Sequence, residues 1–461
     1  MVESHGEVDQ DKKRADATVV PAAIVAPPTL EPCIRYALQT MLRPHGIELD
    51  VLPAEQLPAD RPSIVYAPAE VDVPSAALRF DASPAVADYY DALPADLPDS
   101  TDPLAVFADD QGRPDQLASA FFWLNGTQEY VLRPRDEHGR FLYEGSFTEK
   151  LNIVDEPVVD GLSDAIATRL ADRGVVVRRP DYHGRAWALC PTHDIDYIRR
   201  LRPGIIWRDL RRTAAEPAHL RRVLHQQRGG DPYRRSLYTM MREVQRRGGT
   251  ATWFFKAGAS SVHDVPYRLP SAGLQRFVEQ VRDAGSEIGL HPSYHAAHDP
   301  RRLADERRRL AEAFGAPPTS IRNHYLRYDI ARTPQLQQAA GFSIDTTLGF
   351  PDREGFRFGT CRPFRLFDLR TRRELDIIEA PLTFMDAALF NRTCYTVDEA
   401  IDRTWRLMDT CRRYGGICVG LWHNVVDDTA DFPGRHRHFI ATLDHAAANN
   451  AAILSLQDAL G

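Results

Sequence analysis

In the second half of the chain, short apolar runs alternate with longer stretches that are charged and helix-like. Residues 273–285 and 305–315, for example, repeat apolar positions every three or four residues, which is the pattern of an amphipathic helix. This alternation is typical of βα units around a parallel sheet, and about seven or eight units in about 280 residues favour a closed β/α barrel. The apolar runs that predict strands lie at residues 186–194, 251–258, 286–293, 320–328, 342–350, 375–384, 415–424 and 451–459.

The first half has a different texture, in which helices and short strands mix without regular alternation. Residues 32–46 predict an amphipathic helix that ends at Gly46, and residues 159–174 predict another with a glycine stop. Residues 62–68 predict a buried strand, and residues 117–131 an apolar helix. The chain therefore divides into a disordered N-terminus (1–28), an N-terminal α/β domain of unknown role (29–178) and a β/α domain (179–461).

Composition supports two folded domains and narrows the class of protein. At 461 residues the chain exceeds one ordinary core, and 43% hydrophobic with 26% charged residues is the range of globular proteins. A net charge of -7 argues against a dedicated nucleic-acid partner. No run is long and apolar enough to predict a membrane span, and the first residues lack the apolar core of a signal peptide. Six scattered cysteines without a CxxC pair favour free thiols in a reducing compartment, so we expect a cytoplasmic protein.

Polar side chains gather where the predicted strands end. The segments THDID, HPSYH, RNHYLR, DTT and WHN each follow an apolar run. In a β/α barrel the carboxyl ends of the strands converge on the face that carries the active site. Residues far apart in sequence are therefore expected to meet there.

Two of these segments predict a metal site. His291 and His295 are four residues apart, a spacing that places both imidazoles on one side of a helical turn. Asp194 and Asp196 follow the first strand of the barrel at a spacing of two. One aspartate and two histidines form a three-ligand site with open positions, and the other aspartate is free to act as a base. Taken singly, each pair also fits a structural interpretation, as a loop cap or a chance spacing.

Three further strand-end residues are candidates for the chemistry. His423 in WHN is a candidate general acid that protonates a leaving group. Arg322 could keep the base carboxylate ionised, and Asp345 could orient or tune the acid histidine. A structural ion pair across the mouth of the barrel is the alternative for Arg322 and Asp345.

Residues 180–461 resemble the polysaccharide deacetylase family, also known as the NodB-homology family or carbohydrate esterase family four. The resemblance implies a distorted (β/α)7 barrel, a divalent metal, with zinc expected, and five ordered motifs. By the resemblance, Asp194 is the base and Asp196 a metal ligand, with His291 and His295 as the other ligands. The residues that the remaining motifs place are Arg322, Tyr325 with an oxyanion-binding N–H, Asp345 and the acid His423.

The motifs also depart from the family pattern. Pro292 stands where a serine or threonine usually follows the first histidine, and Asn323 and His324 replace prolines of the third motif. The front half resembles a domain that precedes the deacetylase in a bacterial subfamily. The leading hypothesis is a metal-dependent deacetylase of an amino sugar or glycan. The alternatives are a hydrolase of another non-peptide C–N bond, such as a small amide, and a catalytically silent glycan-binding scaffold.

One basic segment leaves two interpretations open. Residues 199–247 contain 14 arginines against four acidic residues. These charges fit solvated helix faces, or an edge that attracts an anionic glycan or a nucleotide- or lipid-linked sugar. The expected partner is therefore an amino-sugar or glycan substrate, and the basic segment would suit an anionic or carrier-linked form of it. No nucleic-acid partner is expected. Sequence does not determine the oligomeric state.

Overall fold

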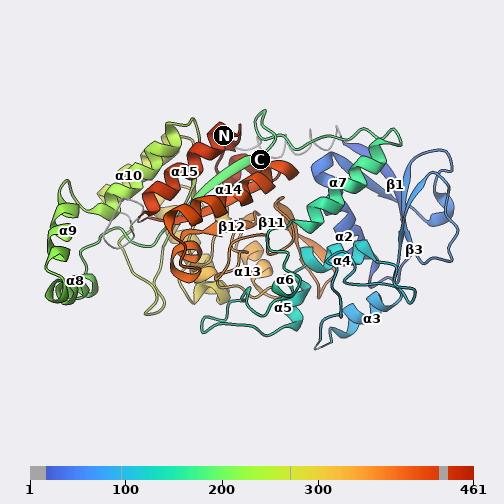
Figure 1. The fold of residues 1–461 in the computed structure, drawn as a ribbon, viewed down its shortest axis with the longest axis horizontal. Helices are drawn as coiled ribbons and strands as arrows, with labels where there is room; N and C mark the ends of the chain where they lie inside the picture. The colour runs from blue at the N-terminus through green and yellow to red at the C-terminus, as the bar shows by residue number, and fades with distance from the viewer. Residues whose placement is uncertain (1–16, 95, 270, 425–433) are drawn as a thin grey trace.

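The computed structural model describes residues 17–94, 96–269, 271–424 and 434–461, and these form a mixed α/β fold with two sheets (Figure 1). The smaller sheet is parallel, in the order β2-β1-β3-β4. Its strands are β1 (Thr18–Ile24), β2 (Ile47–Val51), β3 (Ser63–Ala67) and β4 (Ala77–Asp81). The helices of this part are α2 (Glu31–Leu42), α3 (Ala85–Ala92), α4 (Gln116–Leu124), α5 (Thr127–Val131), α6 (Phe147–Lys150) and α7 (Val158–Ala171).

Strand β1 corrects the expectation that residues 1–28 are disordered. It lies inside the small sheet, paired with β2 and β3, and its residues Val20–Ala23 are buried. Because VVPAAI is apolar and short, it gains enough burial between two strands to be ordered. The rest of that expectation, residues 1–16, lies outside the described residues. The predicted helix over residues 32–46 is confirmed as α2, which a left-handed Gly46 follows after one 3-10 turn.

The larger sheet has ten strands, in the order β10-β11-β9-β8-β7-β6-β5-β13-β12, with β14 paired to β5. All neighbouring strands are parallel except β10 and β11. The predicted alternation of strands and helices is confirmed from β5 to β9 and again from β12 to β14, but β9, β10, β11 and β12 follow one another without a helix, and the strand predicted over residues 375–384 is split into β11 and β12. The strands are β5 (Ala188–Ile195), β6 (Thr252–Phe255), β7 (Glu287–Leu290), β8 (Ser320–Ile321), β9 (Ile344–Asp345), β10 (Phe364–Asp368), β11 (Arg373–Glu379), β12 (Leu382–Met385), β13 (Ile417–His423) and β14 (Ala452–Ile453).

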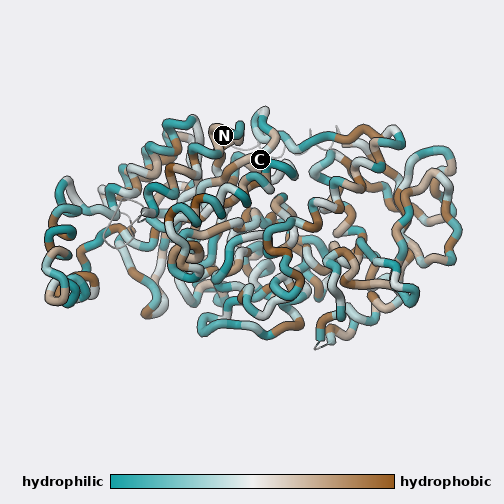
Figure 2. The backbone as a smooth tube through the Cα atoms, viewed as in Figure 1, coloured by the Kyte–Doolittle hydropathy of each residue, from teal (hydrophilic) through white to brown (hydrophobic). Residues whose placement is uncertain are grey.

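Helices follow the strands of the larger sheet and pack around it. The helices α14 and α15 pack against each other, and Figure 2 shows apolar and hydrophilic positions alternating along the outer helices. This is the amphipathic pattern expected of helices that cover a buried sheet. They are α8 (Pro203–Ala215), α9 (Ala218–Gln227), α10 (Pro232–Gln245), α11 (Ala272–Asp283), α12 (Pro300–Phe314), α13 (Thr333–Ala339), α14 (Val397–Tyr414), α15 (Arg435–Ala448) and α16 (Leu456–Leu460).

The two sheets share one continuous hydrophobic core. Helix α2 packs against β1 and β2 of the small sheet and against β10 and β11 of the large one. Tyr36 on α2 contacts the ring of Phe367 and donates its hydroxyl to the carbonyl of Arg365. A buried ion pair between Glu129 and Arg357, at 2.6 Å, also joins the two parts. The N-terminal region, residues 17–178, is therefore packed directly onto the strands that build the site.

Candidate metal and catalytic site

The carboxyl ends of the parallel strands line a cavity of about 300 Å³. Strand β5 brings Asp194 and Asp196 to it, β7 is followed by His291, and β13 ends at His423. These four residues and Tyr325, all singled out in the sequence, therefore line the same cavity. His324, which was not assigned to the site from the sequence, follows β8 and lines the cavity as well.

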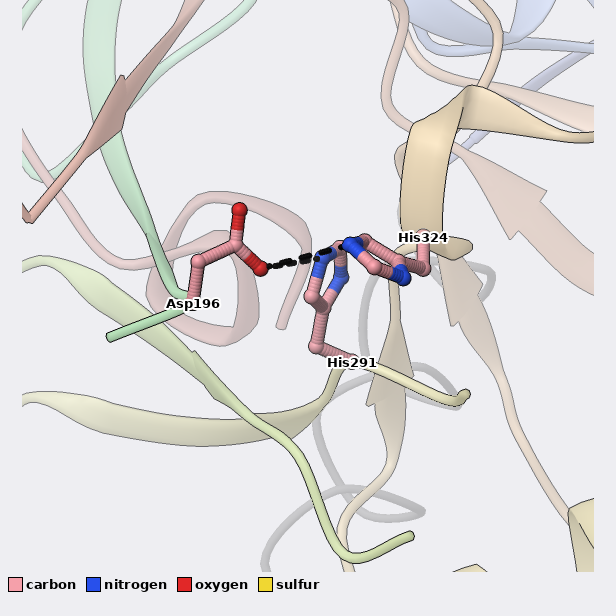
Figure 3. A group of neighbouring side chains, drawn as sticks. All are labelled: Asp196, His291 and His324. Carbon is pink, nitrogen blue, oxygen red and sulfur yellow. Dashed lines mark ion pairs between the residues drawn. The ribbon is translucent and has the colours of Figure 1, made fainter. Parts of the chain in front are cut away.

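Asp196, His291 and His324 form a compact group of possible metal ligands (Figure 3). Oδ1 of Asp196 lies 3.6 Å from Nε2 of His291 and 3.5 Å from Nε2 of His324. Ligand atoms that sit about 2.0–2.1 Å from a zinc ion in tetrahedral geometry are about 3.4 Å apart. Both distances from Asp196 are therefore close to the donor spacing of a tetrahedral divalent site, and all three donors lie within 4.8 Å of one another.

Hydrogen bonds fix both imidazoles with Nε2 as the acceptor atom. Nδ1 of His291 donates to the carbonyl of Arg322 at 2.7 Å, and Nδ1 of His324 donates to Asp264 at 2.9 Å. Burial lowers the pKa of His291 to about 4, so this ring is neutral at pH 7. A second hydrogen bond of this kind commonly orients a histidine that binds metal through its other nitrogen. In the described part of the chain, the buried Oδ1 of Asp196 accepts no hydrogen bond. The donor set therefore fits a divalent cation.

A buried lysine adds a positive charge beside the same atoms. Nζ of Lys256 lies 2.8 Å from Oδ1 of Asp196, as an ion pair outside hydrogen-bond geometry, and 3.2 Å from Nε2 of His324. Burial would raise the pKa of Asp196, but the Lys256 ammonium and the neighbouring imidazoles hold it well below its usual range. Asp196 is therefore ionised, and part of its charge is neutralised by the chain itself. The position of Lys256 directly after β6 was the strand-end signal that could have identified it from sequence.

His295, the predicted third ligand, lies outside this group and is exposed. The spacing of four places side chains on one side only within a helix. Here the chain after His291 is not helical until the 3-10 turn Ala296–His298, so the two imidazoles diverge. The structure places His324 beside Asp196 instead. Its place at the end of β8, within RNHY, was the sequence signal for it.

A hydrogen bond from Arg322 holds the carboxylate of Asp194 in place. Nη1 of the fully buried Arg322 donates to Oδ1 of Asp194 at 3.2 Å, and its other nitrogens donate to the carbonyl and hydroxyl of Thr346. The second oxygen of Asp194 lies 3.7 Å from Nε2 of His291. The pair therefore presents one carboxylate oxygen toward the group of metal donors.

His423 faces the same group from β13 and carries its own carboxylate partner. Nδ1 of His423 donates to Oδ1 of Asp386 at 2.6 Å, and Arg435 pairs with the other oxygen of Asp386. Burial would lower the pKa of His423, but the charge and hydrogen bond of Asp386 raise it to about 9. His423 is therefore protonated at neutral pH. Its Nε2 lies 3.8 Å from Oδ2 of Asp196.

The predicted partner of His423 was Asp345, and the structure corrects that assignment. Asp345 accepts hydrogen bonds from the backbone and hydroxyl of Thr347, and burial raises its pKa to about 6. Asp386 tunes His423 because β12, which it directly follows, is the neighbour of β13. The strand-end rule applied to LTFMD could have found it.

Tyr325 is strained and lines the cavity. Its backbone has φ 61° and ψ 13°, in the left-handed region that favours glycine. Its N–H makes no hydrogen bond to another group in the part of the chain that the structure describes. A donor of this kind is available to a ligand.

The N-terminal region reaches the cavity through one turn. Arg140 lines the cavity, pairs with Asp136, and donates from Nη1 to the carbonyl of Tyr325 at 3.2 Å. The carbonyl of His138 accepts from Arg327 at 3.1 Å. The turn therefore braces the segment that holds Tyr325.

Comparisons with known proteins cover the two halves of the chain separately. A family model described as a family of unknown function, DUF7033, matches residues 23–174. No curated protein matches the chain. Among the described residues, every helix is too short or too polar to cross a membrane.

Matches to solved structures are weak. A chain from Mycobacterium smegmatis assigned as a polysaccharide deacetylase is 17% identical, with TM-score 0.41, over 60% of this chain and 89% of that one. A family 4 carbohydrate esterase from Streptomyces lividans is 12% identical, with TM-score 0.31, over 57% and 90%. A pseudoenzyme of the same esterase family from Bacillus anthracis is 10% identical, with TM-score 0.28, over 62% and 68%. At these scores the likenesses do not assign an activity.

Proposed function

We propose that the protein is a metal-dependent hydrolase that removes an N-acetyl group from an amino sugar or glycan. The observation that carries the proposal is the placement of an arginine-held carboxylate, Asp194, and a protonated histidine, His423, on either side of one donor group. Amide hydrolysis needs a base for the attacking water and an acid for the departing amine, and a carboxylate and a protonated imidazole are suited to these two roles. We further propose that the larger sheet is a distorted (β/α)7 barrel.

In this proposal each residue has one task. A divalent cation, with zinc expected, would be held by Asp196, His291 and His324 and would supply Lewis acidity to the water and the acetyl carbonyl. Asp194 accepts the proton of the water, and the hydrogen bond from Arg322 holds the carboxylate in place. The N–H of Tyr325 stabilises the developing oxyanion, a contact worth about 3 kcal/mol in other hydrolases.

His423 completes the reaction. It donates the proton on Nε2 to the leaving amine, while Asp386 holds Nδ1 and the ring orientation. Acetate and the free amine are the products. The cavity of about 300 Å³ is at the lower end of the range for ligand pockets, which suits the acetamido end of a sugar more than a whole oligosaccharide.

A second candidate is a catalytically silent glycan-binding protein. The observation that favours it is the ion pair of Lys256 with Asp196, in which the ammonium supplies a positive charge where a metal ion would otherwise do so. A hydrolase of another non-peptide C–N bond, such as a small amide, uses the same residues and differs only in substrate. An anionic or carrier-linked sugar as substrate, and a cytoplasmic location, belong to the proposal as well.

Acetate release by the purified full-length protein tests the proposal. N-acetylated oligosaccharides and small N-acetyl amides are supplied in parallel with zinc, and acetate is measured with and without a chelator. We expect acetate release from the oligosaccharides. Both the chelator and Asp194→Asn should abolish this release. Turnover of the small amides alone would support the amide hydrolase, and zinc binding without any acetate release would support the silent protein.

A further inference from the structure

Helices α8 and α9 form a hairpin at the end of the molecule opposite the small sheet (Figure 1). Of the nine large hydrophobic side chains that are most exposed in the described residues, six lie within residues 201–224. Trp207 is 64% exposed and Leu210 56%, and Leu220 and Leu224 form a second stripe on α9. Solvated helix faces, one interpretation of this basic segment, do not carry such a concentration of apolar side chains.

The hairpin is amphipathic in the reverse sense of an ordinary surface helix. The residue that α8 buries is Asp209, which is 8% exposed, and it pairs with the fully buried Arg200 and with His219 on α9. Polar groups therefore face inward, together with Val223 of α9, and they are satisfied by one another, whereas Trp207 and Leu210 face outward. Because ion pairs lie on the inner side of the hairpin, its large apolar side chains stay exposed on the outer side, where a partner can cover them.

Charge indicates what that partner is. Residues 203–228 contain six arginines and two acidic residues, and both acidic side chains are already paired, Asp209 as above and Glu216 with Arg222. Arg211, Arg212 and Arg221 are exposed beside the apolar stripes. Tryptophan and leucine on one face with arginines around them is the composition of helices that lie in the plane of a membrane surface. Arginines there gain further attraction from anionic headgroups.

We infer that the α8–α9 hairpin docks the protein on an anionic lipid surface, with Trp207 and Leu210 inserted and the arginines at the headgroups. The hairpin is inserted directly after β5. Tyr197, one residue after Asp196, lines the cavity and lies under the guanidinium of Arg202, 4.2 Å from its ring centre. The docking element and the cavity are thus joined without an intervening domain. The inference does not depend on the proposed hydrolase activity.

Vesicle co-sedimentation of the full-length protein tests the inference. The vesicles are phosphatidylcholine alone, or equal parts of phosphatidylcholine and phosphatidylglycerol. We expect binding to the mixed vesicles that weakens as salt is added. The double variant Trp207→Ser with Leu210→Ser should bind at least about tenfold more weakly, as should Arg211→Gln with Arg212→Gln. Val262→Ser, which removes a 95% exposed valine elsewhere, is the matched control and should bind as the wild type does.

A second readout follows Trp207 itself. Of the six tryptophans, Trp207 is the exposed one, so brominated lipids in the vesicles should quench a part of the fluorescence that the Trp207 variant lacks. No sedimentation with either vesicle would overturn the inference. Equal binding to both vesicles, unchanged in the arginine variant, would overturn the role of anionic lipid. Loss of a dimer in the Trp207 and Leu210 variant, measured by light scattering without vesicles, together with no vesicle binding, would show instead that a second copy covers this face.

Discussion

Lys256 and Asp196 form a buried ion pair in which Nζ lies 2.8 Å from Oδ1. The same oxygen is one of three donors that fit a divalent cation. A cation about 2.0 Å from that oxygen would lie at most about 4.8 Å from Nζ, where repulsion between the two charges is about 7 kcal/mol at an effective dielectric of about 20. The ammonium and a metal ion would therefore compete for Asp196.

Lys256→Met should raise the affinity for metal and lower the folding stability of the metal-free protein. We expect the zinc affinity to rise at least about tenfold, since the competing charge is gone. The metal-free variant should lose about 3 kcal/mol of stability, because Asp196 is left buried without its partner. Calorimetric titration with zinc and thermal unfolding with and without metal measure both effects. Lys150→Met, at an exposed lysine paired with Asp99, is the control, and weaker zinc binding by Lys256→Met would contradict the competition.

The identity of the third ligand is open to a direct comparison. His324→Ala should lower zinc affinity by about 100-fold or more, since one of three protein donors is lost. His295→Ala should stay within about threefold of the wild type, because that side chain is exposed and outside the group. Cobalt absorption spectra of both variants would report the change of ligand directly. The reverse order of effects would restore the pair predicted from sequence.

Asp386→Asn should move the alkaline limb of the pH–activity profile. The acid His423 must be protonated to work, so activity is present below its pKa of about 9 and is lost as pH rises through that value. Removal of the Asp386 charge lowers this pKa, and the limb should shift to lower pH, with kcat reduced about 10- to 100-fold. The profile of acetate release gives the measurement. Asp345→Asn should leave the limb in place, and a shift there instead would return the tuning role to Asp345.

Arg140 allows a test of what the N-terminal region does for the site. Arg140→Met should lower kcat about 10- to 100-fold through loss of its bond to the Tyr325 carbonyl, while zinc affinity is unchanged. Arg140→Lys should recover part of the rate. The chain offers a matched control in Arg113, which closes an equivalent turn with Asp109 and is more exposed.

Arg113→Met should therefore have little effect on kcat. An equal loss in both variants would show that Arg140 acts only through the stability of its turn. A change in KM with kcat preserved would place Arg140 in contact with substrate rather than behind Tyr325.

The sequence by itself determined the order of strands and helices from β5 to β9 and the edge at which Asp194, Asp196, His291 and His423 meet. It did so because apolar periodicity sets the strands, and parallel strands bring their carboxyl ends to one face. The same rule also marks Lys256, His324 and Asp386, each of which follows a predicted strand. What it does not contain is the direction of each side chain after the strand has ended.

Only the tertiary structure decided that direction. His295 turns outward because the chain after His291 is not helical, and His324 turns inward at the left-handed Tyr325. Asp386 reaches His423, and Asp345 does not, because β12 and β13 are neighbours in the sheet although about 35 residues separate them. Arg140 reaches the cavity because the turn at residues 136–140 contacts the backbone of Tyr325 and the side chain of Arg327, which lie far away in the sequence. Spacing along the chain fixes local geometry, whereas these contacts depend on which strands and helices pack together.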